Sequence, residues 1–326
     1  NKLFKNTYTY GYLYLVNHFI WLWGFLFWIT SVKWLRPFNS ACSILINRLN
    51  SKNFLNYLIN EQPDIIISTH FLPPELAGYL KRKNKIKSKI ITVITDYGVH
   101  PYWINSQTDI YIAASSFTKA QLIEKGVGED LIQELGIPVD AKFSEKFDKI
   151  SLRKKFGLKV DSFTVLITTG SFGIGPVVEI VQALHREVQL IVICAKNQQL
   201  YNKLKTKNFP NVLALGFINN IQEVMAASDI VIAKPGGLTI SEILTIGIAP
   251  IFIHPICGQE TKNIEAMARF GIGKFAKSVL DIENTAFEYK KHPEKLEKIR
   301  QAISAIKKPF AAKDLYDVIC QGCSRA

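Results

Sequence analysis

The chain has 326 residues, of which 48% are hydrophobic and 21% are charged, and its formal net charge is +13. This length allows about two domains of ordinary size, and the composition predicts globular domains with substantial cores rather than a disordered chain. The five cysteines are not spaced as a disulfide framework, and the lone pair Cys320 and Cys323 has no second pair and no histidine nearby. Reduced thiols in a cytosolic protein are therefore expected.

The most apolar stretch covers residues 18–30, carries Trp21, Trp23 and Trp28, and is followed by basic residues. About 20 apolar residues are needed to cross a bilayer, so this segment is too short to span one securely. Tryptophans with basic flanks are typical of a segment that lies among lipid headgroups. Peripheral or monotopic attachment to the cytoplasmic face of a membrane is favoured, with a buried helix and a true span as alternatives.

Short strands and helices alternate through the rest of the first half. After a helix at 41–60, strands are expected at 65–68, 89–95 and 109–113, with helices at 73–83 and 116–126.

The connection at 81–89 packs six basic residues into nine positions, and residues 1–89 carry nine of the thirteen excess positive charges. Such a patch suits anionic lipid or nucleic acid, and a solvated loop is the alternative. The aromatic residues cluster in one block instead of interleaving with the bases, so a membrane surface is favoured and no nucleic acid is expected.

The second half alternates strands and helices more regularly. Strands are expected at 163–168, 189–194, 211–215, 229–233 and 250–254. This alternation predicts an α/β protein with a parallel, doubly wound sheet. A Gly/Pro break and a charged segment at 136–149 mark the boundary between two domains.

The sequence KPGGLTISE, residues 234–242, is the most informative motif. An apolar strand ends at the glycine pair, and a helix is expected from Leu238 to Ile246, where Gly247 stops it. Glycines let the backbone approach a phosphate, and the free N–H groups at a helix N-terminus attract it. Glu242, about one turn into this helix, can accept two hydrogen bonds from a ribose. The motif predicts a nucleotide diphosphate site; a tight turn without a ligand is the alternative.

Three motifs carry a resemblance to a glycosyltransferase family. The stretch 216–229, the GGLTISE run and PICGQETKN at 255–263 resemble its donor half, while ITDYGVHPYWI and LGIPVDAKF point to its diacylglycerol branch. The family holds processive diacylglycerol glycosyltransferases, plant monogalactosyldiacylglycerol synthases and, more distantly, the peptidoglycan N-acetylglucosaminyltransferase. The similarity covers residues 56–317.

The resemblance implies a GT-B fold, in which two doubly wound Rossmann-like domains face a cleft. We expect an acceptor and membrane-binding domain at 1–145, a UDP-sugar donor domain at 146–308, and a C-terminal helix at 309–326 that crosses back to the first domain. The family begins with a strand and a glycine-rich loop bearing a histidine, and no such loop occurs in the first 60 residues. The first domain is therefore expected to be truncated.

The resemblance also implies roles for residues of the donor domain. Phe217 and Ile218 would contact the uracil, Glu242 the ribose, and the backbone and side chains of the two glycine-containing turns the diphosphate. Alternatives are a core-closing role for Phe217, a plain turn at 170–173, and a surface ion pair for Glu242. The remaining donor-binding residues are Ser171, Gly237, Leu238 and Thr239 for the phosphates and Gln259, Glu260 and, more weakly, Asn263 for the hexose.

No DxD pair ends a strand, so neither a divalent metal nor another cofactor is expected. The N-terminus of the helix after the glycine pair would balance the diphosphate charge instead.

The acceptor side is predicted from the loop that follows the strand at 89–95. Asp96 and His100 are the catalytic candidates, because each could accept a proton or orient the acceptor hydroxyl. A structural cap is the alternative for His100, and Trp103 is expected to contact lipid. His70 is a third candidate, while the family's own base, the histidine of the glycine-rich loop, has no counterpart.

Together these observations predict a membrane-associated inverting enzyme that moves a hexose from a UDP-sugar to diacylglycerol or glycosyl-diacylglycerol. Its partners would be a UDP-hexose, the lipid acceptor and an anionic membrane surface. Two alternatives stay open: an undecaprenyl-linked acceptor, as in peptidoglycan synthesis, and a non-catalytic fragment that binds UDP-sugar without turnover.

Overall fold

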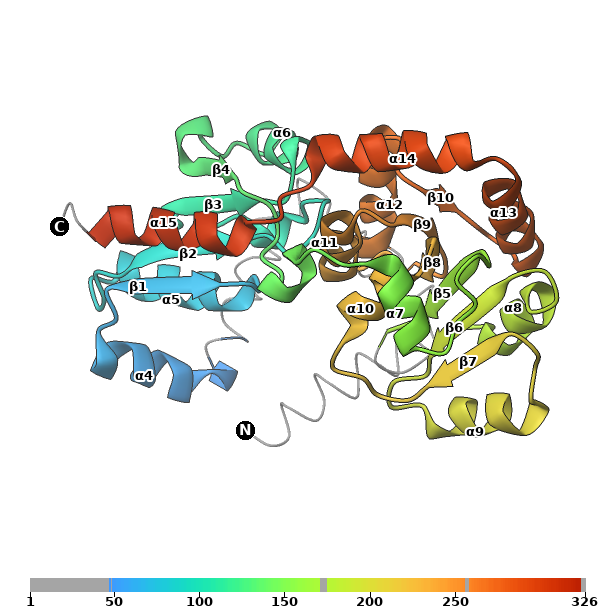
Figure 1. The fold of residues 1–326 in the computed structure, drawn as a ribbon. Helices are drawn as coiled ribbons and strands as arrows, with labels where there is room; N and C mark the ends of the chain where they lie inside the picture. The colour runs from blue at the N-terminus through green and yellow to red at the C-terminus, as the bar shows by residue number, and fades with distance from the viewer. Residues whose placement is uncertain (1–46, 48, 171–174, 256–257, 324–326) are drawn as a thin grey trace. The chain divides into compact units, whose positions relative to one another are not determined.

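The computed structural model describes residues 47, 49–170, 175–255 and 258–323 (Figure 1). The chain forms two compact units. Unit 1 runs from Asn1 to Ile137 and includes Ile256–Lys262, and unit 2 comprises Pro138–Pro255 and Asn263–Ala326. The division after Ile137 lies a few residues before the expected boundary at 145. The segment 309–323, expected to cross back, groups with unit 2 by its contacts.

Unit 1 is built on a four-stranded parallel sheet of order β1-β2-β3-β4. Residues buried on both faces of β2 and β3 show that helices or loops cover both sides of these strands. Strand bounds are β1 Ile65–Ser68, β2 Lys89–Val93, β3 Ile110–Ala113 and β4 Ile132–Glu134. The helical segments are α4 Lys52–Glu61, α5 Leu72–Arg82, η2 Pro101–Trp103, α6 Ser116–Glu124 and η3 Glu129–Leu131.

Unit 2 is built on a six-stranded parallel sheet of order β10-β9-β8-β5-β6-β7. The four central strands are buried along their whole length, as expected for a sheet with helices on both faces. Strand bounds are β5 Thr164–Thr168, β6 Gln189–Ile193, β7 Val212–Leu215, β8 Ile230–Ala233, β9 Ala249–Phe252 and β10 Lys274–Phe275.

The helices of unit 2 form two packed groups. Helices α7, α10 and α11 pack in series, and α8, α13 and α14 form a second series that also packs against β9. Their bounds, with those of the other helices, are η4 Ala141–Ser144, α7 Lys149–Lys155, α8 Val177–Leu184, α9 Gln198–Lys207, α10 Ile221–Ala227, α11 Gly237–Ile246, α12 Gln259–Arg269, α13 Val279–Lys291, α14 Pro293–Ile306 and α15 Ala311–Cys323.

The expected strands and helices after residue 60 are confirmed with ends shifted by one or two residues. Gly247 ends α11 as predicted, with the positive φ of +85° that favours glycine at this position. Strands β4 and β10 were not predicted, because three and two residues at a sheet edge are too short to show a period.

The helix expected at 41–60 is wrong in its extent. Ser51 has φ −114° and ψ 26°, so it interrupts the helical path, and α4 begins at Lys52. Residues 47, 49 and 50 are helical, and the rest of the expected start lies outside the described residues.

No helix within the described ranges is long and apolar enough to cross a membrane. Trp21, Trp23 and Trp28, on which the membrane segment was predicted, lie outside those ranges.

Candidate functional site

Polar and glycine residues follow the carboxyl ends of the strands in unit 2. Gly216 follows β7, Lys234 follows β8, and His254 closely follows β9. Ligands of open parallel sheets bind at this edge, where the strand-to-helix loops gather. Gly170, at the end of β5, has a φ of +78°, and Ser171 next to it lies outside the described residues.

The turn before α11 leaves a helix N-terminus without a side-chain cap. Gly236 is the N-cap residue and makes no side-chain hydrogen bond to the first turn of the helix. The fully buried Asn263 donates its Nδ2 hydrogen to the Pro235 carbonyl, at 3.0 Å. Asn263 thus holds the turn in shape, while the amides of the first helical turn can bind an anion. At this turn Gly237 is buried, Thr239 half-buried and Leu238 52% exposed.

Glu242 is a half-buried carboxylate in the middle of α11. Burial raises its pKa to about 7, and the positive charge of Lys142 opposes that rise. Its neighbour Ser241 is turned inward and donates to the Gly237 carbonyl at 3.0 Å. Among the described residues no hydrogen-bond donor engages the Glu242 carboxylate. Both of its oxygens can therefore accept hydrogen bonds from a ligand.

The turn between β7 and α10 presents an exposed aromatic ring. Phe217 is 67% exposed and Ile218 is half-buried. Because the Phe217 ring is open, it does not close the core, which had been the alternative role for this residue. The next residue, Asn219, accepts a hydrogen bond at its carbonyl from Lys142 Nζ at 3.3 Å.

Gln259 and Glu260 form the start of α12, and Gln259 belongs to unit 1 by its contacts. Its Nε2 donates to Asp96 Oδ2 at 2.6 Å. A Cβ atom on Gly98 would lie 2.3 Å from the Lys262 Cβ, so this close approach requires glycine. The structure therefore brings together two predicted site residues, Gln259 and Asp96.

Asp96 and Trp103 lie on a loop that unit 1 holds firmly. Asp96 is 3% exposed, and the Gln121 side chain accepts the Val99 amide at 3.1 Å. Trp103 is 5% exposed and packs in the core that includes Ile94. In this position the indole stabilises the loop; contact with lipid stays a prediction that its burial does not favour.

Both histidines of the predicted acceptor side accept a backbone amide, and His100 is the N-cap of η2. His100 Nδ1 accepts the Tyr102 amide and His70 Nδ1 accepts the Leu72 amide, each at 3.2 Å. The structural alternative for His100 is thus what the structure contains. A neutral imidazole whose Nδ1 accepts a hydrogen bond carries its proton on Nε2, so its one basic lone pair, on Nδ1, is already engaged by the backbone amide. Burial lowers the pKa of His70, which disfavours that charge.

Two residues near the donor motifs were missed by the sequence reasoning. Lys142 lies within the LGIPVDAKF motif and acts electrostatically on Glu242. His254 follows β9 with a φ of +44°, and burial and Lys234 lower its pKa. The position of His254 just past an apolar strand was a usable signal, whereas the motif that contains Lys142 gave no sign of a contact with the donor residues.

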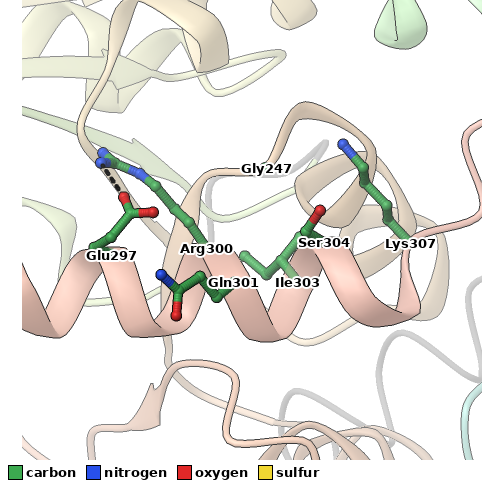
Figure 2. A pocket seen from close by; sticks show the side chains of 7 residues that line it. All are labelled: Gly247, Glu297, Arg300, Gln301, Ile303, Ser304 and Lys307. Carbon is green, nitrogen blue, oxygen red and sulfur yellow. Dashed lines mark ion pairs between the residues drawn. The ribbon is translucent and has the colours of Figure 1, made fainter.

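A shallow hollow of about 310 Å³ lies on α14, away from these residues. Figure 2 shows its side chains, including Glu297 and Arg300, whose charged atoms are 3.8 Å apart. None of the predicted donor residues lines it; its lining is Gly247, Glu297, Arg300, Gln301, Ile303, Ser304 and Lys307.

Two sequence families match the chain. The family described as monogalactosyldiacylglycerol (MGDG) synthase matches residues 1–139. The glycosyltransferase family 28 C-terminal domain matches residues 164–263, which include α11 and the start of α12.

The processive diacylglycerol beta-glucosyltransferase of Staphylococcus epidermidis (strain RP62A) is 34% identical over 278 residues, covering 81% of this chain and 70% of that protein. The chain belongs to the diacylglycerol glycosyltransferase family. The protein of the same name from Staphylococcus carnosus (strain TM300) is 36% identical over 228 residues. That match covers 68% of this chain and 58% of the Staphylococcus carnosus protein, so the chain spans only part of these curated relatives.

Solved structures agree with the family on the fold. MurG of Acinetobacter baumannii aligns with a TM-score of 0.60 and 16% identity, covering 87% of this chain and 79% of that one. Anabaena Alr3699/HepE in complex with UDP-glucose aligns with a TM-score of 0.54 and 16% identity, covering 83% and 82%. This diacylglycerol glycosyltransferase family member therefore has the predicted GT-B fold of two α/β units.

Proposed function

We propose that this protein moves a hexose from a UDP-sugar to diacylglycerol or glycosyl-diacylglycerol at a membrane surface. The observation that carries the proposal is α11, where an uncapped N-terminus is followed by a half-buried carboxylate to which no described residue donates a hydrogen bond. Family membership supports the lipid acceptor, because the relatives are named for transfer to diacylglycerol.

In the proposed donor site, the diphosphate lies against the amides of Gly237, Leu238 and Thr239. The helix dipole and these N–H groups balance its charge without requiring a metal ion. The ribose hydroxyls donate to Glu242, and the uracil packs on the open ring of Phe217, with Ile218 beside it. Ser171 completes the phosphate contacts in this proposal.

The proposed transfer inverts the configuration at the sugar. The acceptor oxygen attacks C1 of the hexose from the face opposite the diphosphate, and the C1–O bond to the β-phosphate breaks. A base takes the hydroxyl proton, and UDP leaves with the electron pair of the broken bond. As capped, His100 is a poor base, whereas Asp96 is an acceptor, so we propose Asp96 for this role or for the orientation of Gln259.

The two roles of Asp96 can be separated by two substitutions. Asn keeps an oxygen that accepts the Gln259 hydrogen bond but cannot take a proton, whereas Ala removes both functions. If Asp96 is the base, we expect Asp96→Asn and Asp96→Ala to lose hexosyl transfer equally, by about 10²–10⁴-fold. Activity retained in the Asn variant alone would assign orientation and exclude proton transfer.

The proposed membrane surface of unit 1 includes the turn between α5 and β2. Lys81 is paired with Asp109 at 2.6 Å, but four bases of this turn are exposed. The turn lies at the amino end of β2, and Asp96 follows its carboxyl end. The basic residues and the acceptor loop therefore lie at opposite ends of the strands. The exposed bases are Arg82, Lys83, Lys85 and Lys87.

The proposal is tested by incubating the protein with radiolabelled UDP-glucose and vesicles of diacylglycerol in anionic phospholipid. We expect a labelled glycolipid, and its loss in Glu242→Ala. Undecaprenyl phosphate-linked acceptors and other UDP-hexoses are run in parallel. No glycolipid with any common UDP-hexose rejects the transfer, and a product on the undecaprenyl acceptor alone rejects the diacylglycerol assignment.

Membrane attachment is tested separately by sedimentation with vesicles of neutral or anionic phospholipid. We expect binding to the anionic vesicles that weakens when Lys83, Lys85 and Lys87 are replaced by Gln and when salt is raised. Equal binding of the variant and the original protein would remove the basic turn from the proposed membrane surface.

A further inference from the structure

Lys142 lies on a short segment that unit 2 anchors firmly. Asp140 caps η4 by accepting the Lys142 amide at 3.1 Å, and Phe143 is buried with 3% exposure. Ser144 donates to the Pro309 carbonyl at 2.8 Å. These contacts hold the backbone of η4 on both sides of Lys142, so the position of the Lys142 Cα is fixed.

The side chain of Lys142 joins two parts of the proposed donor site. Its Nζ donates to the Asn219 carbonyl at 3.3 Å, which ties η4 to the turn that presents Phe217. Segment η4 also packs against α11, and the Lys142 charge favours the ionised form of Glu242. Asp140 Oδ2 lies 3.3 Å from the same Nζ, and the Lys142 side chain is 34% exposed.

We infer that Lys142 is a positioning residue of the nucleotide site: it holds the Phe217 turn through Asn219 and places a positive charge near Glu242. This inference rests on the proposed function, since it assigns a role within the proposed UDP-sugar site. Lys142 lies on η4, which comes before the first strand of the unit 2 sheet in the sequence. Lys142 acts through Glu242 and Asn219 without touching the ligand.

Helices α10 and α14 also pack against α11, and no charge on either of them shifts the pKa of Glu242. On α10, Glu223 pairs with Lys155 and accepts from Asn220, both at 2.6 Å. On α14, the charged side chains near α11 surround Gly247, at the C-terminal end of that helix. Lys142 is accordingly the charge that lowers the pKa of Glu242, against the rise caused by burial.

The charge of Lys142 and the burial of Glu242 act on the same carboxyl in opposite directions. Replacing Lys142 by a neutral residue removes an opposite charge near the carboxylate, so the pKa of Glu242 rises further. More of the protein then carries a protonated Glu242 at neutral pH. A protonated carboxyl accepts fewer hydrogen bonds, and UDP-glucose binding weakens.

The test is the Kd of UDP-glucose, measured by calorimetry on the full chain at pH 7 and pH 8.5. For Lys142→Met we expect about a tenfold higher Kd at pH 7 and a smaller loss at pH 8.5, where Glu242 ionises again. Lys142→Arg keeps the charge and should bind within about twofold of the original protein. Thermal unfolding checks that each variant is folded.

Lys290→Met is the matched control. Lys290 lies on α13, and its Nζ also donates to a backbone carbonyl, that of Glu187 at 2.6 Å. The Glu187 carboxylate lies 3.5 Å from the same Nζ. The Lys290 side chain is 39% exposed, close to the 34% of Lys142. Because Lys290 is not near Glu242, Lys290→Met should leave the Kd of UDP-glucose unchanged.

Each outcome is decisive. An unchanged Kd in Lys142→Met, or a loss in Lys142→Arg as large as in Lys142→Met, overturns the role of the Lys142 charge and leaves the proposed function standing. An equal loss in Lys290→Met overturns it as well. If the original protein does not bind UDP-glucose at all, the donor half of the proposed function falls, and this inference falls with it.

Discussion

The two ends of the six-stranded sheet in unit 2 differ in how their charges are satisfied. At the amino end, Asp229 lies between Lys149, at 2.5 Å, and Arg153, at 2.7 Å, and accepts the Thr164 amide at 2.7 Å. At the carboxyl end, Glu242 is half-buried with a pKa raised to about 7 and no described donor engaging it.

This difference separates stability from binding within one unit. The Asp229 network joins α7 to the starts of β5 and β8. Its charges are paired with one another, so the network stabilises the fold. The carboxyl end instead keeps a destabilised carboxylate, an open aromatic ring and a helix N-terminus without a side-chain cap. Such groups cost stability in the absence of a ligand, and they are where a ligand can gain binding energy.

The largest effect is expected when the amino end is broken. Asp229→Ala leaves the buried Arg153 unpaired, so we expect the free energy of unfolding of unit 2 to fall by about 3–5 kcal/mol. Urea unfolding followed by circular dichroism measures this loss. Where the variant is folded, its UDP-glucose Kd should equal that of the original protein.

The control for this change is Glu223→Ala, which removes a pair with the 55% exposed Lys155. A surface pair contributes about 0–1 kcal/mol, so little loss is expected. Equal losses in the two variants would show that the Asp229 network contributes no more to stability than a surface ion pair.

Breaking the carboxyl end should change binding and stability in opposite directions. Glu242→Gln removes a charged acceptor of the proposed ribose contacts, so the UDP-glucose Kd is expected to rise by about 10–100-fold. The folded-state pKa of about 7 exceeds the ordinary 4.5, so the stability that Glu242 contributes is complete below pH 4.5 and is lost as the pH rises through 7. Above pH 7 the variant should therefore be more stable, on the order of 1–3 kcal/mol.

Glu288→Gln is the control with the opposite sign. Hydrogen bonds from Lys274 and Lys295 lower the pKa of Glu288 to about 2, so its replacement should not stabilise the protein at pH 7. If Glu242→Gln also lowers the urea midpoint at pH 8, the ionised carboxylate does not destabilise the fold.

Binding of UDP-glucose should also depend on pH. If the ionised Glu242 is required, the Kd is expected to rise about tenfold from pH 8 to pH 6, one pH unit below the pKa of about 7. UDP-glucose is preferred to UDP as the probe, because its diphosphate has no terminal group that titrates in this range. The dependence should vanish in Glu242→Gln; its persistence there would assign it to another group.

The smallest effect is expected at the aromatic ring. Phe217→Ala should raise the Kd of UDP-glucose about three- to tenfold, since a ring stacked on a base contributes about 0.5–1.5 kcal/mol. Phe217 is 67% exposed, so the urea midpoint should not move. Phe310→Ala, at a ring with 61% exposure outside the proposed site, is the matched control, and an equal effect there would remove Phe217 from the nucleotide contacts.

The sequence by itself determined the alternation of strands and helices, the parallel sheets and the turn before α11. These follow from local signals: apolar runs such as 229–233, the glycine pair and the glycine at 247. The resemblance carried by the motifs named the family, which the relatives confirm.

Only the tertiary structure decided what each side chain contacts. It placed Asn263 beneath the Pro235 turn, made His100 a cap, buried Trp103 and set Gln259 against Asp96. It also brought Lys142 to Asn219, 77 residues further along the chain. Periodicity reports which face of a segment is buried, whereas hydrogen bonds and charge contacts depend on segments that meet only when the chain folds.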